Sequence, residues 1–356
     1  MKILIFNPFG IGDVLFTTPL IRNIKDNFPS AVLTYICNKR TYPLIKKNIF
    51  IDKIYIFEKD EWRQEFTISR QKLLRKFLEL FTKIKKERFD VVFDLSFNPK
   101  YGFFFKLVGI KKRIGYSFKH RGIFLTHKVN LPDGYRDYPV AKYHLSLLQF
   151  LGVKGKDYKF DLFLGEEEIK EACRYLEKLG VDKKKPIIGV CPGSGDSWQE
   201  LAYFKRWPKE NFVRLVDILK EEFNTEVIIF GSPSEIPLGN FLVSQTRFKP
   251  INLCGKITLE EFQSLLSLCE VVITNDGGPF HISQALGKNI IAFFGPVDDN
   301  VYGPYSSERN CIVLKKEFKC RPCYQAFKFK GCSYDKRCLR EITVEEVVRA
   351  VKTMLS

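Results

Sequence analysis

The chain has 356 residues, of which 45% are hydrophobic and 28% are charged. This length suits two α/β domains better than one, and the composition excludes a mainly disordered chain. The formal net charge is +17, which predicts an anionic partner such as nucleic acid, a membrane surface or a phosphorylated substrate. A Lys-rich composition throughout the source organism's proteins would explain the same total.

The chain begins with a strand-like segment. Residues 3–7 are followed by Pro8 and Gly10, so the apolar run is too short and too quickly broken for a signal peptide. No run approaches the ~20 apolar residues of a membrane-spanning helix. We therefore expect a cytoplasmic protein.

Strand-like and helix-like segments alternate through the first half of the chain. Helices are expected at 13–28 and at 70–86, the second with apolar residues at three- and four-residue spacings. Alternation of this kind implies a parallel sheet with right-handed crossovers. The expected strands are 3–7, 32–37, 53–57 and 90–95.

A second series of the same kind follows a change of composition between 152 and 185, where glycines, a charged helix and a Lys-Lys-Lys-Pro run occur. We expect an N-terminal domain over 1–165, a second domain over 186–340, and a C-terminal helix within 341–356 that Thr343 can cap. Two such domains place a central cleft at the carboxyl ends of both sets of strands. The expected elements of the second domain are strands at 187–191, 226–230, 271–275 and 290–294 and helices at 210–223, 259–268 and about 279–286.

Part of the positive charge is concentrated between Lys100 and Lys128, a segment without Asp or Glu. Three consecutive phenylalanines, at 103–105, lie in the same segment. A basic, aromatic surface of this kind suits a partner rich in phosphate and carboxylate.

The first motif, residues 7–13 (Asn-Pro-Phe-Gly-Ile-Gly-Asp), follows the first strand. Gly10 and Gly12 let backbone amides approach a ligand at a helix start, where anions are favoured. Leu15 replaces the third glycine of a dinucleotide-binding fingerprint and no acidic residue closes the second strand, so a nicotinamide cofactor is disfavoured. The motif displays one carboxylate, Asp13, which either acts on a ligand or caps the helix.

The second motif, residues 271–281, leads a strand into a Gly-Gly turn and a helix with Pro279 at its first position. The amides at this helix start would hold a diphosphate, and His281 in the first turn would point toward the same anion. A tight turn capped by Asp276 is the structural alternative. The coincidence of several anion-binding features favours a functional site.

The third motif joins residues 191–195 (Cys-Pro-Gly-Ser-Gly) with residues 205–208 (Lys-Arg-Trp-Pro). Lys205 could neutralise a leaving diphosphate. On this segment alone, an exposed lysine before a helix is an equally good interpretation.

Together and in this order, the motifs resemble those of glycosyltransferase family 9, the ADP-heptose:lipopolysaccharide heptosyltransferases. The resemblance covers positions 1 to about 305. It implies the GT-B fold, an α/β architecture of two Rossmann-like domains facing a central cleft. It also implies inverting transfer of a heptose or related sugar from an ADP-sugar to a lipopolysaccharide core or lipid A-type acceptor.

The same resemblance implies roles for single residues. Asp13 would be the general base that deprotonates the acceptor hydroxyl, in the loop that contains Gly10 and Gly12. Glu235, a looser match, would lie near the nucleotide ribose. The residues implied to form the donor site around the diphosphate and ribose are Ser194, Lys205, Glu235, Asp276, Gly277, Gly278 and His281.

The departing diphosphate needs positive partners. No Asp-x-Asp occurs in the chain, so the carboxylate bridge to a metal that the other glycosyltransferase fold uses is absent. We expect no metal cofactor, with Lys205, His281 and a helix start supplying the charge.

The expected partners are a nucleotide-sugar donor, by resemblance ADP-heptose, and an anionic glycolipid acceptor. The acceptor would bind the N-terminal domain, with Lys111, Lys112 and Arg113 contacting it or the inner membrane, where the protein would be peripheral. Nucleic acid is not expected, because no recognition module occurs. The alternatives are a nucleotide-sugar epimerase or hydrolase on the same fold, and a basic nucleic-acid-binding protein.

Five cysteines lie close together near the C-terminus. The Cys320-x-x-Cys323 spacing is typical of a metal knuckle, and Cys332 with Cys338 could complete four ligands. Surface disulfides and simply packed thiols are the competing interpretations.

Overall fold

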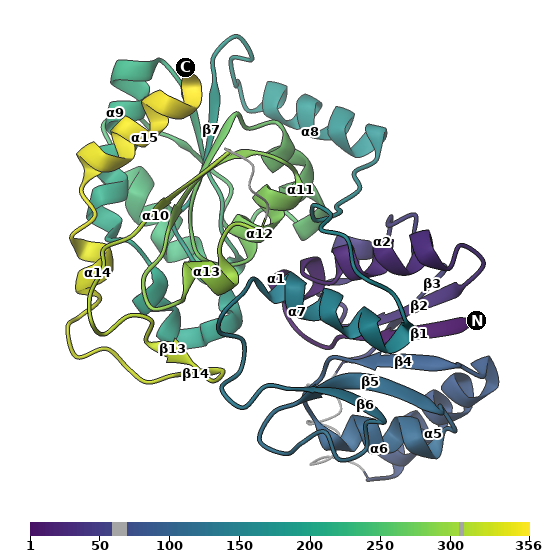
Figure 1. Cartoon of the computed structure of the whole chain (residues 1–356). Coiled ribbons are helices and arrows are strands. Elements are labelled where there is room, and N and C mark those ends of the chain that lie inside the picture. Colours follow the sequence, from purple (N-terminus) through teal and green to yellow (C-terminus); the bar gives the residue numbers. More distant parts are fainter. Residues whose placement is uncertain (59–69, 306–309) are drawn as a thin grey trace. The chain divides into compact units, whose positions relative to one another are not determined.

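The computed structural model describes residues 1–58, 70–305 and 310–356, and its internal contacts divide the chain into two compact units, Met1–Asp161 and Leu162–Ser356. Each unit contains one six-stranded sheet, and every strand pair in both sheets is parallel (Figure 1). The expected α/β class is confirmed.

The sheet of unit 1 has the strand order β3-β2-β1-β4-β5-β6. Because the chain turns in opposite directions from β1 and from β4, the boundary between these two strands is the switch point of the sheet. The strands are β1 (Lys2–Phe6), β2 (Val32–Cys37), β3 (Lys53–Ile56), β4 (Val91–Asp94), β5 (Lys112–Ser117) and β6 (His127–Asn130). The helices are α1 (Ile11–Leu15), α2 (Thr18–Asn27), α3 (Tyr42–Ile45), α5 (Arg70–Glu87), α6 (Pro99–Leu107) and α7 (Val140–Ser146), with a 3₁₀ segment η1 (Leu147–Leu151).

The central strands of unit 1 are covered on both faces. Ile3, Leu4 and Ile5 in β1 are fully buried, as expected for a parallel strand between two layers of helices. On one face, Ile84 of α5 and Phe105 of α6 pack with Leu4 in one hydrophobic cluster. On the other face, α2 packs against α7.

The helix expected over 13–28 is two helices, α1 and α2, with a break at residues 16–17. Pro19 lies in the first turn of α2. Proline has no N–H and its ring collides with a preceding turn, so it is tolerated at a helix start and not in a helix interior. The proline therefore fixes the second helix start and leaves α1 as a short element that carries Asp13.

The basic segment between Lys100 and Lys128 is part of the fold, because it contains most of α6, all of β5 and the start of β6. The side chains of this segment therefore divide between core and solvent. Phe105 is buried, for example, while Phe103 is 43% exposed.

The sheet of unit 2 has the strand order β12-β11-β10-β7-β8-β9. It lies between α9 and α15 on one side and α8, α11 and α12 on the other (Figure 1). Its strands are β7 (Ile187–Cys191), β8 (Glu226–Ile229), β9 (Ile251–Asn252), β10 (Val271–Asn275), β11 (Asn289–Phe293) and β12 (Cys311–Leu314), and a separate antiparallel pair is formed by β13 (Tyr324–Gln325) and β14 (Lys328–Phe329). The helices are α8 (Glu166–Lys178), α9 (Lys209–Phe223), α10 (Ile236–Gln245), α11 (Leu259–Ser267), α12 (Gly278–Ala285), α13 (Asp299–Tyr302), α14 (Arg337–Arg340) and α15 (Val344–Leu355), with 3₁₀ segments η2 (Asp196–Lys205) and η3 (Pro233–Glu235).

The C-terminal helix α15 belongs to the core of unit 2. Thr343 caps it as expected: the Thr343 hydroxyl accepts the N–H of Glu346 at 3.2 Å, and the Glu346 carboxylate accepts the N–H of Thr343 at 2.8 Å. Val347 and Val351 of this helix pack into the cluster that contains Trp207.

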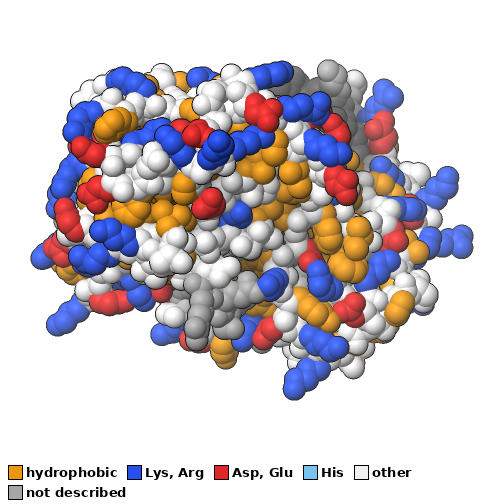
Figure 2. Space-filling model, turned by 90° about the horizontal axis from the view of Figure 1, so that it is seen from above, with side chains coloured by type: hydrophobic (Ala, Val, Ile, Leu, Met, Phe, Trp, Pro, Cys, Tyr) orange, Lys and Arg blue, Asp and Glu red, His pale blue; other side chains and the backbone are white. Residues whose placement is uncertain are grey.

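No helix among the described residues is long and apolar enough to cross a bilayer. On the face drawn in Figure 2, Lys and Arg side chains are spread out and interleaved with Asp and Glu.

The buried imidazole of His144 makes the stability of unit 1 sensitive to acid. Its Nδ1 lies 2.8 Å from the hydroxyl of Tyr116, and burial lowers its pKa to about 3. An unfolded histidine takes up its proton near pH 6.5. The unfolded chain therefore binds more protons than the folded chain below that pH, and stability falls as the pH falls.

The variant His144→Gln keeps a hydrogen-bonding group at this position and cannot titrate. When the pH is lowered from 7 to 4.5, we expect its free energy of unfolding to fall by about 2 kcal/mol less than that of the unsubstituted protein. Urea unfolding of both proteins at the two pH values measures the difference. The contributions of all other titratable groups are the same in both proteins and cancel. Equal losses in the two proteins would contradict the assignment.

Candidate active site

Asn275 connects the loops at the carboxyl edge of the sheet in unit 2. Its fully buried side chain donates to the carbonyls of Pro192 and Gly193 at 2.8 and 2.9 Å and accepts the N–H of Trp207 at 2.8 Å. One amide group at the end of β10 thus holds the loop after β7 and the start of the chain that leads into α9. These bonds bring the second and third sequence motifs together.

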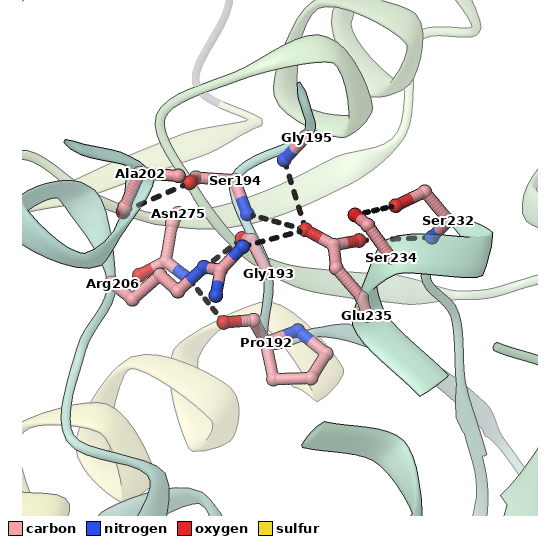
Figure 3. Close-up of polar contacts among 10 residues, drawn as sticks. All are labelled: Pro192, Gly193, Ser194, Gly195, Ala202, Arg206, Ser232, Ser234, Glu235 and Asn275. Carbon is pink, nitrogen blue, oxygen red and sulfur yellow. Dashed lines mark hydrogen bonds and ion pairs between the residues drawn. The ribbon is translucent and has the colours of Figure 1, made fainter. Parts of the chain in front are cut away.

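The loop after β7 lies along one side of the Glu235 carboxylate, and Ser232 lies on the other side, as Figure 3 shows. Its Oε1 accepts the N–H groups of Ser194 and Gly195, both at 3.0 Å, and its Oε2 accepts the N–H of Ser232 at 2.9 Å. Arg206 adds a guanidinium nitrogen 3.4 Å from Oε1. The carboxylate is buried, and three amides and one cation hold it in a fixed position.

Two glycines are required here because other groups come very close to their backbone. A Cβ on Gly193 would overlap the carboxylate of Glu235, and a Cβ on Gly277 would lie 2.7 Å from the carbonyl oxygen of Ser194. A side chain at position 193 would displace Glu235 of η3, and a side chain at position 277 would push the loops after β7 and β10 apart. The Ser194 hydroxyl itself donates to the carbonyl of Ala202 at 3.2 Å.

Lys205 and Asp276 form a buried ion pair beside this loop. The ammonium nitrogen of Lys205 lies 2.7 Å from Oδ2 of Asp276, and both side chains are less than a tenth exposed. The same ammonium lies 5.0 Å from the centre of the Trp198 ring, a cation–π contact. Asp276 thus fixes the position of the lysine, whose ammonium group has three donors in all.

His281 lies in the first turn of α12 and is buried. Burial lowers its pKa to about 4, aided by Lys205, while Asp276 opposes the shift. The imidazole is therefore neutral near pH 7. The expected positive charge at this edge of the sheet comes from Lys205 and from the N-terminus of α12, and not from His281 as the sequence alone predicted.

The loop of unit 1 that contains Asp13 is held by its own side chains. Oδ2 of Asp13 accepts the N–H of Gly10 at 3.1 Å, and the side chain of Asn7 donates to the backbone carbonyl of Asp13 at 2.9 Å. The carbonyl of Gly12 accepts the N–H of Phe16 within the helix. Asp13 is half-buried on the first turn of α1. Asp13 thus makes the helix-capping contact that was one of the two roles expected for it from the sequence.

The three expected surface cations of unit 1 differ in their surroundings. Lys111 is exposed, and Lys112 is half-buried at the first position of β5. The guanidinium of Arg113 donates to the backbone carbonyls of Phe124 at 2.7 Å and Ile110 at 2.5 Å. Arg113 therefore holds the ends of β5 and its neighbouring loop, while Lys111 can meet a partner.

Comparison with known proteins identifies the group to which the chain is related. Residues 77–333, well over half of the chain, match the sequence profile of glycosyltransferase family 9 (heptosyltransferase). The chain belongs to glycosyltransferase family 9. It is therefore a glycosyltransferase.

Relatives of this family 9 glycosyltransferase cover nearly its whole length. It is 27% identical to lipooligosaccharide heptosyltransferase 2 of Haemophilus influenzae strain Rd over 88% of this chain and 89% of that protein. It is 26% identical to lipooligosaccharide heptosyltransferase 2 of Campylobacter jejuni serotype O:2 over 100% and 98% of the two chains.

Solved structures show the same fold. The family 9 glycosyltransferase of Veillonella parvula matches with a TM-score of 0.83 at 22% identity, covering 99% of this chain and 97% of that one. The ADP-heptose lipopolysaccharide heptosyltransferase II of Escherichia coli matches with a TM-score of 0.77 at 21% identity, covering 100% and 98%. The GT-B fold that the resemblance implied is thus confirmed.

Two residues of this glycosyltransferase were present in the motifs and were not predicted as site residues. Asn275 precedes the acidic residue of its motif, and only the tertiary structure shows that it connects three loops. Arg206 follows Lys205 directly and contacts Glu235. The position of Asn275 at the carboxyl end of a parallel strand was a signal that could have identified it, whereas Arg206 follows no strand.

All ten cysteines of the family 9 enzyme lie in the described part of the chain, and none of them forms a disulfide. Cys320, Cys332 and Cys338 all influence Cys323 electrostatically, so the four thiols are neighbours; burial is the main reason why the pKa of Cys323 rises to about 11. Within residues 1–58, 70–305 and 310–356, no three His, Cys, Asp or Glu side chains are grouped so that they could hold a metal ion.

Removal of one partner of the buried Lys205–Asp276 pair should destabilise the enzyme. Lys205→Met leaves a buried carboxylate without its cation, which costs about 3–5 kcal/mol. The double variant K205M/D276N should regain most of that loss. Urea unfolding of the two single variants and the double variant gives the coupling energy.

The exposed pair Arg214–Glu345, at 3.1 Å in the same unit, is the matched control. Its coupling, measured with R214M and E345Q, should stay below about 1 kcal/mol. Equal coupling in the two pairs would show that burial does not strengthen the Lys205–Asp276 interaction.

Proposed function

We propose that this glycosyltransferase moves a heptose from an ADP-activated donor onto the anionic core of a lipopolysaccharide or lipooligosaccharide, with inversion at the anomeric carbon. Relatives over nearly the full length are heptosyltransferases of lipooligosaccharide and lipopolysaccharide. The observation that carries the proposal is the buried Lys205–Asp276 pair, because Asp276 holds the ammonium group of Lys205 in a fixed position, with donors left for a leaving diphosphate.

The donor would bind to unit 2 at the carboxyl ends of β7, β8 and β10. The first-turn N–H groups of α12 have no partners within their own helix and face an anion with the positive end of the helix dipole. Gly278 belongs to this turn, Gly277 precedes it, and Ser194 lies against Gly277. Lys205 would pair with the diphosphate through the donors that Asp276 does not use, and His281 would be a neutral hydrogen-bonding group.

Glu235 would bind the ribose. Its carboxylate is anchored by three amides and cannot turn away, so it presents accepting lone pairs to a diol in a constant position. Arg206, whose Nε is buried without a hydrogen-bond partner among the described residues, is a further group for the nucleotide.

Asp13 would be the general base. In the reaction it takes the proton from the acceptor hydroxyl, the resulting oxygen attacks the anomeric carbon, and the bond from that carbon to the diphosphate oxygen breaks. ADP leaves with both electrons of that bond, and Lys205 together with the start of α12 stabilises its negative charge. A base within hydrogen-bond reach contributes about 10²–10⁴-fold to such a step.

Asp13→Asn separates the two roles of this residue, because an asparagine oxygen can still accept the N–H of Gly10 and cannot take a proton. We expect donor affinity and the melting temperature to change little and transfer to fall by about 10²-fold or more. Release of ADP is measured with and without acceptor, and donor binding is measured by calorimetry. Asp133→Asn, an exposed carboxylate of unit 1, is the control.

Near-normal transfer by Asp13→Asn would reduce Asp13 to a helix cap. ADP release at the same rate without acceptor would identify a hydrolase in place of a transferase.

We infer further that unit 1 makes peripheral contact with an anionic membrane. A groove of about 1080 Å³ lies between the ends of α5 and α6, and its wall combines the cations Lys85, Lys86, Arg88 and Lys111 with Phe81, Phe89 and Val108. Leu107, half exposed, ends α6 beside it. Lysines with apolar neighbours suit the head-group region of a bilayer.

The double variant K86A/K111A should bind vesicles of anionic phospholipid about tenfold or more weakly, because each lysine near such a surface contributes about 1 kcal/mol. Added salt should weaken binding of the unsubstituted protein. Co-sedimentation measures both effects, and K183A/K184A in unit 2 removes the same charge elsewhere. Binding that ignores salt, or that falls equally in both variants, would refute the proposed surface.

A further inference from the structure

Half-buried aromatic rings gather at the switch point of the sheet in unit 1. Phe9 follows β1, Phe97 follows β4, and Tyr135 follows β6, so all three come from the carboxyl ends of parallel strands. Ring centres of Phe9 and Phe97 are 6.3 Å apart, and those of Phe97 and Tyr135 are 5.8 Å apart. We call Phe9, Phe97 and Tyr135 the aromatic floor; each is partly exposed.

A second layer of buried rings supports this floor. Phe97 stacks on Tyr116 at 5.3 Å with an interplanar angle of 14°, and Tyr135 packs against Tyr143 at 4.9 Å. Tyr116 and Tyr143 are buried. The floor is therefore a rigid, uncharged surface, since its rings cannot turn without disturbing the layer below.

The backbone of Phe97 is held in an unfavourable conformation. Its φ is +55°, in the left-handed region that a bulky residue rarely adopts. Such a conformation is strained and persists where surrounding bonds enforce it. Here Ser96 donates its N–H and its hydroxyl to Oδ1 of Asp94. The Ser96 hydroxyl also accepts the N–H of Asn98, and the side chain of Asn98 caps α6.

The floor adjoins the proposed base. The N–H that Asp13 accepts belongs to the peptide bond between Phe9 and Gly10, so the first ring of the floor and the carboxylate are attached to the same short loop. A sugar whose hydroxyl approaches Asp13 would have its apolar C–H face next to these rings. Ligands in open α/β sheets bind at this switch point, and apolar aromatic walls with few polar groups are typical of such sites.

We propose that the aromatic floor is the acceptor subsite, on which the ring of the accepting core sugar stacks so that its hydroxyl meets Asp13. This inference rests on the proposed transferase function, and it assigns acceptor recognition to residues that the donor does not touch. Phe97 is then a positioning residue for the acceptor, and the strain at its backbone serves to present its ring.

Phe97→Gly tests the proposal, because glycine adopts φ near +55° without strain and so retains the loop while it removes the ring. We expect the KM for a water-soluble, deacylated lipopolysaccharide core acceptor to rise about 5- to 10-fold, the affinity gained in one aromatic contact. The KM for ADP-heptose and the kcat at saturating acceptor should stay within about twofold. Phe97→Trp should restore acceptor affinity.

Phe248→Ala, which removes an exposed ring from unit 2, should leave every constant unchanged. An acceptor KM that is equal in Phe97→Gly and the unsubstituted enzyme would overturn the acceptor subsite while the transferase function stands. Absence of transfer to any core acceptor by the unsubstituted enzyme would instead overturn the proposed function itself. A matched fall in donor and acceptor affinity would show that Phe97 only supports the fold.

Discussion

The loops at the carboxyl edge of the sheet in unit 2 depend on one side chain, that of Asn275. Its amide satisfies two carbonyls and one N–H that would otherwise be buried without partners, and each such group costs about 1–3 kcal/mol when left alone. Because these bonds come from the end of β10, the positions of the loop after β7 and of Lys205 follow from the position of the sheet. Glu235, Arg206 and Asp276 then fit around loops that are already fixed.

The two units use opposite chemistry at equivalent places in similar folds. At the carboxyl edge of its sheet, unit 2 concentrates backbone amides, Lys205 and a helix start, which suit a charged leaving group. At the corresponding edge, unit 1 presents aromatic rings and the carboxylate of Asp13, which suit a sugar ring with a reactive hydroxyl. A parallel sheet supplies the same geometry in both cases, and short loop sequences determine what each edge binds.

Much of the fold and the location of the candidate site could be predicted from the sequence. β-Branched runs followed by glycine turns located both sheets, three motifs located the carboxyl edges, and the Thr343 cap followed from one threonine with two glutamates. β5 and β6 were missed because their polar, basic residues hide the strand pattern. The break between α1 and α2 was missed because Pro19 was not read as a helix start.

The state of individual side chains was harder to predict than their location. His281 was correctly placed on the first turn of α12, yet its charge depends on burial, which a motif does not show. Arg113 was expected to be a free surface cation, and its guanidinium instead satisfies backbone carbonyls. The three rings of the aromatic floor come from three separate stretches of the chain, so no local sequence pattern predicts it.

The backbone amides around Glu235 bear on which nucleotides could bind at this edge of the sheet. A loop of this kind after a strand commonly receives a phosphate, but here the protein's own carboxylate fills it. A nucleotide with a phosphate on its ribose would set two anions against each other in a buried place, where their repulsion is poorly screened. With the ribose bound at Glu235 as proposed, this carboxylate would disfavour phosphorylated riboses by electrostatic repulsion and would so discriminate among adenine nucleotides before any contact with the base is made.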